Sequence, residues 1–110
     1  KINLLLSPDS SSKFIIPGFG MMDEIKLYKK AGLSNYDILK AGTINFSKYF
    51  NDISTGSIEV GKTADFLIVT ENPLEKIETL EKIEGIFYNN NYLDKKKLND
   101  LTTSILSNKN

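Results

Sequence analysis

Hydrophobic residues recur at helical spacing in the first half of the chain and at strand spacing in the second half. Ahead of the helices, four of the five residues in Ile2–Leu6 are apolar, which predicts a strand buried on both faces, as in a parallel sheet. Three helices are then expected, over Met22–Ala31, from Ser34 onward, and over Phe46–Phe50. Ser34 and Asn45 are the predicted N-caps of the second and third helices, because their short side chains can accept hydrogen bonds from backbone N–H groups.

The second half of the chain predicts strands. Ser57–Val60 alternates between polar and apolar residues, Gly61 predicts a turn, and the continuously apolar Phe66–Val69 predicts a further strand. A hairpin is expected from Ile83–Tyr88 to Tyr92–Leu93, because the three asparagines between them tolerate the positive φ values of a tight turn.

One connection and one helix complete the predicted elements. Leu74–Leu80 is expected to form a helical turn or an irregular connection. Asp94 predicts the N-cap of a final helix, on which Leu98, Leu101 and Ile105 follow one another at spacings of three and four residues.

The amino-acid composition excludes several kinds of catalytic and binding site. The 110 residues include 14 Lys and no Arg against 14 Asp and Glu, and they contain no His, Cys or Trp. Without Cys and His the chain has no disulfide, no thiol nucleophile, no Ser-His-Asp triad and no histidine-based zinc site of its own. A net charge of zero without Arg argues against nucleic-acid binding, and no apolar run reaches the roughly 18–20 residues of a membrane helix.

The segment GSIEVGKT (Gly56–Thr63) matches the phosphate-loop pattern GxxxxGK[ST] at every fixed position. A phosphate loop needs a strand before it and a helix after it, whereas polar residues precede this segment and the strand-like Phe66–Val69 follows it. Glu59 would also face the phosphates with like charge. We therefore interpret the segment as a hairpin with Gly61 in its turn, and keep nucleotide binding as an alternative.

Four segments together resemble the C-terminal region of the metal-dependent amidohydrolase superfamily. In chain order they are LLLSPDS (Leu4–Ser10), PGFGMMDEI (Pro17–Ile25), AGLSNYDILKAGTINFSKYF (Ala31–Phe50) and GSIEVGKTADFLIVTENPLEKI (Gly56–Ile77). The likeness is greatest to the branch with imidazolonepropionase-like and Xaa-Pro dipeptidase-like enzymes, and it runs from Leu4 to about Leu93. The chain departs from the family pattern at Met22, where many members have His, and at Ser7-Pro8, which replaces Gly-Thr or Gly-Ser.

The resemblance implies an α/β fold built from parts of two units. Residues 1–55 would be the last strand, loop and helices of a (β/α)8 barrel, and residues 56–93 the C-terminal part of a small composite β-sandwich. Residues 94–110 would add a C-terminal helix and tail. Because the chain begins Lys1-Ile2-Asn3 without an initiator Met, we expect it to be a fragment of a longer protein.

The resemblance also implies a reaction. Family members use one or two divalent metals, typically zinc, to activate water for attack on an amide, cyclic amide or dipeptide C–N bond. Asp9 would be a metal ligand and the catalytic proton shuttle, and Gly18 and Phe19 would lie beside the substrate. The histidine ligands would precede Leu4, so we expect the 110-residue fragment alone to hold no metal and to be inactive.

The expected partners are a small-molecule or dipeptide-like substrate, the remainder of the barrel and a further copy in a homo-oligomer, with neither nucleic acid nor a membrane among them. A non-catalytic structural or binding module that reuses these elements is the competing interpretation. The sequence indicates no compartment beyond a cytoplasmic default.

Overall fold

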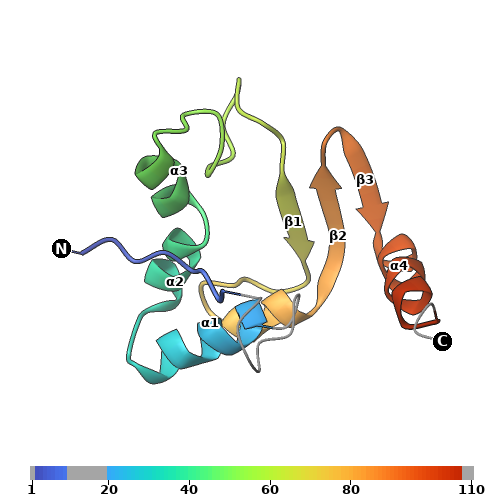
Figure 1. The fold of residues 1–110 in the computed structure, drawn as a ribbon, viewed down its shortest axis with the longest axis horizontal. Helices are drawn as coiled ribbons and strands as arrows, with labels where there is room; N and C mark the ends of the chain where they lie inside the picture. The colour runs from blue at the N-terminus through green and yellow to red at the C-terminus, as the bar shows by residue number, and fades with distance from the viewer. Residues whose placement is uncertain (1, 10–19, 108–110) are drawn as a thin grey trace.

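The computed structural model describes residues 2–9 and 20–107, and places three helices on one side of a small antiparallel sheet (Figure 1). The helices are α1 (Gly20–Lys30), α2 (Asn35–Ala41) and α3 (Ile44–Phe50). The second half holds β1 (Phe66–Val69), the 3₁₀ helix η1 (Ile77–Glu81), β2 (Ile83–Tyr88), β3 (Asn91–Asp94) and α4 (Lys95–Ser107). Within the described residues, no helix combines the length and hydropathy of a membrane span.

The three predicted helices of the first half are confirmed, with shifted bounds. α1 begins two residues before the predicted Met22 and ends at Lys30, with Asp23 in its first turn and two lysines in its last, as the helix dipole favours. Ser34 caps α2, because its Oγ accepts a hydrogen bond from the Asp37 N–H at 3.1 Å.

The predicted cap of α3 is wrong. Thr43 occupies the N-cap position, and Asn45 is the second residue of the helix. The Asn45 side chain is buried and donates to the backbone carbonyl of Leu4 instead, at 2.9 Å. The NH₂ group of an Asn side chain can donate to a carbonyl far away in the sequence, and at this position that hydrogen bond replaces a capping hydrogen bond within the helix.

The sheet has the order β1-β2-β3, with both neighbouring pairs antiparallel. The predicted hairpin is confirmed, because Asn89 and Asn90 adopt φ values of 48° and 61° in the turn between β2 and β3. The Asp94 cap is also confirmed, since the Lys97 N–H donates to Asp94 Oδ1 at 2.9 Å. The sheet therefore runs directly into α4, which lies beyond β3 on the side away from the other helices (Figure 1).

Two predicted strands do not form within the described residues. Ile2–Leu6 has no sheet partner there and lies against the helices, with Leu6 buried but Leu4 40% exposed. Ser57–Val60 is a loop in which Ile58 is 84% exposed, so the expected hairpin around Gly61 is reduced to its turn. A strand needs a neighbour for its backbone groups, and local alternation does not supply one.

The buried core joins the helices to the N-terminal segment and to the second half of the chain. Its members are Leu6, Ile25, Ile38, Ala41 and Ile77. Ile77 comes from η1, so this residue brings the sheet-containing half onto the helical layer. A salt bridge of 2.7 Å between Lys26 of α1 and Glu81 of η1 lies over the same junction.

The loop between α3 and β1 packs closely against α3 at Gly56. This glycine has φ +84°, and a Cβ built on it would lie 2.9 Å from Ser47 Cβ and 3.2 Å from Ile44 Cα. Gly61 in the same loop has φ +89°, but a Cβ there would meet nothing within 4 Å. Both glycines therefore have a positive φ, but only Gly56 lacks the space for a side chain.

This difference predicts unequal costs of Gly→Ala. Gly61→Ala should lower the free energy of unfolding by about 1–2 kcal/mol, because an L-residue disfavours the left-handed region. Gly56→Ala should add about 1–3 kcal/mol to that cost, since the new methyl group overlaps α3. Urea denaturation of the two variants measures both values, and equal losses would show that the loop does not pack on α3 as described.

Candidate functional site

Asp9 lies at the end of the segment that crosses the helices. It is exposed and adopts φ 49°, a left-handed backbone conformation that Asp tolerates better than most residues. Pro8 fixes the backbone just before it. The other two predicted site residues, Gly18 and Phe19, lie outside the described residues.

The segment before Asp9 is held by helices rather than by a sheet. The Leu6 N–H donates to the Ala41 carbonyl at 3.0 Å, next to the Asn45 contact with Leu4. The Tyr28 hydroxyl donates to the Leu5 carbonyl at 2.8 Å. Partial burial, followed by the nearby Glu24 carboxylate, raises the pKa of Tyr28, so the hydroxyl stays protonated and able to donate.

The described residues do not fit a complete metal site. No group of three or more carboxylate, imidazole or thiolate side chains comes together within residues 2–9 and 20–107. Zinc in proteins takes three or four protein ligands, and the chain has no His or Cys to add to Asp9. Asp9 could be one ligand of a metal only if the other ligands came from elsewhere.

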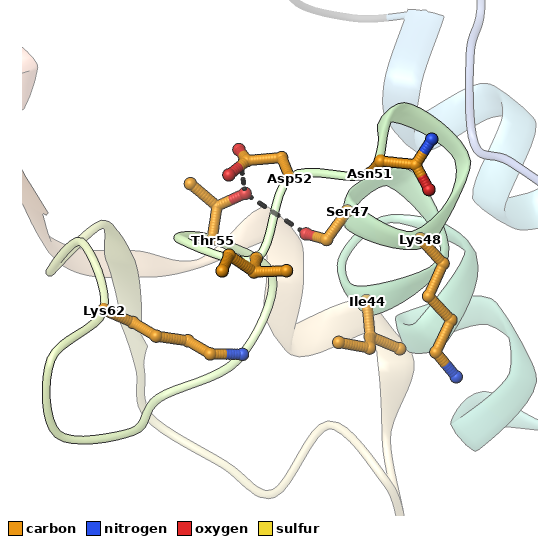
Figure 2. Close-up of a pocket in the computed structure, with 8 residues that line it drawn as sticks. Ile44, Ser47, Lys48, Asn51, Asp52, Thr55 and Lys62 are labelled. Carbon is orange, nitrogen blue, oxygen red and sulfur yellow. Dashed lines mark hydrogen bonds between the residues drawn. The ribbon is translucent and has the colours of Figure 1, made fainter.

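A pocket of about 420 Å³, lined by both polar and apolar side chains, lies between α3 and the loop after it (Figure 2). Its carboxylate is Asp52, which accepts hydrogen bonds from the hydroxyls of Ser54 at 2.6 Å and Thr55 at 2.8 Å. Thr55 Oγ1 lies 3.1 Å from Ser47 Oγ, so the network ties the loop to α3. These hydrogen bonds, first from Ser54 and then from Thr55, hold the pKa of Asp52 below its usual value. The arrangement ties the loop after α3 to this helix.

The phosphate-loop pattern is not built as a phosphate loop. Lys62 Nζ donates to Ser57 Oγ at 2.5 Å and pairs with Glu59 at 3.2 Å, so the cation is already neutralised within the loop. The hydrogen bond from Ser57, followed by Lys62, lowers the pKa of Glu59. The chain then continues into β1 rather than into a helix, and this arrangement removes the structural support for nucleotide binding.

A second cleft, of about 600 Å³, separates the helical layer from the sheet and is lined mainly by apolar side chains. They include Leu39 and Phe46 from the helices, Ile58 from the loop, Phe66 and Leu67 from β1, and Leu80 from η1. Ile58 and Leu67 are 84% and 51% exposed. The lining also includes the carboxylate of Asp65, but its apolar side chains predominate, so the cleft offers a surface for an apolar partner.

A model of the "Amidohydrolase family" matches residues 5–94. The chain belongs to the amidohydrolase family. The match begins and ends within one residue of the range over which the sequence resembles these enzymes, and it includes Asp9 and the loop that carries the phosphate-loop pattern.

One solved structure with a similar fold is the crystal structure of an amidohydrolase. The two align with a TM-score of 0.61 at 24% sequence identity. The alignment covers 67% of the 110-residue chain and 19% of the solved chain. The alignment thus spans about a fifth of the solved protein's length. No curated protein matches the chain.

Two contacts on the Asp9 segment were not found by sequence reasoning. Asn45 is predicted as a helix cap, and the local pattern gives no partner for Tyr28. Their partners lie 41 and 23 residues away in sequence, beyond the reach of a local pattern. A polar group at an otherwise inward-facing helical position is the one signal that could have suggested them.

The Asp52 network predicts a pH dependence. Thr55→Val removes one hydroxyl donor, so the Asp52 carboxyl should titrate closer to the ordinary value of 3.8, as followed by NMR of its side-chain carbon. Because the folded-state pKa is depressed, the stabilisation by this network is present above the unfolded pKa and is lost as the pH falls through the folded one. The difference in stability between the wild type and Thr55→Val should therefore shrink on acidification, and a pH-independent difference would contradict the assignment.

Proposed function

We propose that this chain is the C-terminal part of a metal-dependent amidohydrolase that hydrolyses a non-aromatic C–N bond, as in an amide, a cyclic amide or a dipeptide. The observation that carries the proposal is the family match over residues 5–94, which covers both the Asp9 segment and the sheet. The motifs favour the branch with imidazolonepropionase-like and Xaa-Pro dipeptidase-like enzymes. The substrate is accordingly a small molecule or a dipeptide-like compound.

In this proposal Asp9 is both a metal ligand and the proton shuttle. A carboxylate at the end of a barrel strand can accept a proton from an attacking water and deliver it to the leaving nitrogen. The divalent metal, for which we propose zinc, would supply the activated water when bound, and its other ligands would come from outside this chain. Gly18 and Phe19 are proposed to border the substrate.

We further propose that the remainder of the same barrel covers the apolar cleft. Support comes from the exposed apolar side chains on the two sides of the cleft, including Ile58 and Leu67. The edge of β1 adds to it, because among residues 2–9 and 20–107 the strand Phe66–Val69 pairs with β2 alone, and it contains no charged residue to prevent further pairing. The alignment with a solved amidohydrolase chain that is much longer than its matched part is consistent with such a partner.

Asp9→Asn in the full-length hydrolase tests the catalytic role. Loss of the carboxylate charge removes the proton acceptor, so kcat should fall by at least about 100-fold, the range of a general acid–base group. Asp100→Asn, at an exposed position on α4, is the matched control and should leave kcat within about twofold. Steady-state kinetics on a panel of amides and dipeptides measures both values, and unchanged turnover in Asp9→Asn would show that Asp9 is not the proton shuttle.

The isolated 110-residue chain should behave as an incomplete protein. With one carboxylate in place of a full ligand set, we expect no zinc-dependent hydrolysis of the same substrates. With its apolar cleft and β1 edge uncovered, we expect self-association in light scattering at micromolar concentration. A clean, stable monomer would contradict the proposed partner surface, and metal-dependent turnover would contradict the proposed division of the ligands.

A further inference from the structure

Three consecutive residues before Asp9 are each held by a different helix. Asn45 of α3 donates to the Leu4 carbonyl at 2.9 Å, and Tyr28 of α1 donates to the Leu5 carbonyl at 2.8 Å. The Leu6 N–H completes the set by donating to a carbonyl at the C-terminal end of α2. Two of these three contacts are made by side chains, so substitution can remove them without breaking a helix.

Hydrogen bonds to the helices, instead of pairing with a strand, hold the backbone of Leu4–Leu6. The segment has no strand partner among the described residues, and its backbone groups are instead satisfied by the helical layer. Asn45 is 7% exposed and Leu6 is 5% exposed, so these two partners are buried, whereas Leu4 is 40% exposed and its contact is partly buried. The backbone of Leu4–Leu6 is therefore fixed against α1, α2 and α3 together.

Asp9 is only three residues beyond Leu6, and Pro8 restricts the connection between them. Because Leu4–Leu6 is held in place and the connection to Asp9 is short and stiff, the Asp9 carboxylate can take only a limited set of positions. A displacement of about 1 Å at a reacting group can cost on the order of 100-fold in rate. The hydrogen bonds on Leu4–Leu6 are thus close enough to Asp9 to affect the position of its carboxylate, and through it the reaction rate.

We infer that Asn45 and Tyr28 are positioning residues for Asp9, acting through the backbone of Leu4 and Leu5. This inference rests on the proposed function, in which Asp9 is the proton shuttle. Neither side chain needs to touch the substrate, because each acts on the segment that carries the carboxylate.

The chain contains a matched control for Asn45. Asn35 on the neighbouring helix α2 is 8% exposed, and its amide donates to the Leu74 carbonyl at the same distance of 2.9 Å. Asn35→Ala and Asn45→Ala therefore remove the same amide at nearly equal burial, and Asn35→Ala also removes the acceptor of a hydrogen bond from Lys29 Nζ at 2.6 Å. For Tyr28→Phe, the exposed Tyr36→Phe is the corresponding control.

The first readout is hydrogen exchange in the metal-free, full-length protein. Asn45→Ala should raise the exchange of the Leu6 amide, which donates to Ala41, by about tenfold or more, because the segment opens locally. Asn35→Ala should leave this amide unchanged and act around Leu74. Unchanged exchange at Leu6 in Asn45→Ala would overturn the inference whether or not the enzyme is active.

The second readout is a double-mutant cycle on kcat with the full-length enzyme. Asn45→Ala should lower kcat by about 10- to 100-fold with a smaller change in KM, while Asn35→Ala stays within about twofold. If Asn45 acts through Asp9, adding Asn45→Ala to Asp9→Asn should cause little further loss. Equal losses in the two Asn→Ala variants, or additive losses in the cycle, would overturn the inference and leave the proposed function intact. Full activity of Asp9→Asn alone would overturn the proposed function, and the positioning role with it.

Discussion

Packing of a few apolar side chains between α1, α2, the N-terminal segment and η1 is the constraint on which the rest of the structure depends. Ile25, Ile38 and Ala41 form the helical part of this core, Leu6 brings in the N-terminal segment, and Ile77 brings in the second half of the chain. The core is small, so each member joins segments that have few other contacts. An Ile→Ala change at a buried position of this kind typically costs about 2–5 kcal/mol, which is a large share of the stability of a domain of this size.

Elements with local signals were predicted well from the sequence. Ser34 and Asp94 cap their helices with contacts three residues away, and the asparagine turn between β2 and β3 follows from the positive φ that Asn tolerates. The strand Phe66–Val69 has the bounds that its apolar run predicted. In each case the deciding interaction lies within a few residues or depends on intrinsic backbone preference.

Elements that depend on distant partners were predicted poorly. Ile2–Leu6 and Ser57–Val60 have the patterns of strands, but within the described residues neither has a neighbour to pair with. Asn45 has the residue type of a cap, yet its partner is 41 residues away. For the candidate site, the family motif predicts Asp9, and the structure places it at the end of an anchored segment. Its chemistry stays a prediction, because the chain does not supply the groups that would complete the site.

The long separation of the contacts on the Asp9 segment has a consequence for the order of folding. The β2–β3 hairpin closes over a turn of two asparagines, whereas the Asn45–Leu4 contact closes a loop of 41 residues. Local contacts form early, and contacts that close long loops form late, because chain entropy opposes them until the rest of the core is in place. We therefore expect the segment that carries Asp9 to be among the last parts of the chain to become ordered, and among the first to open.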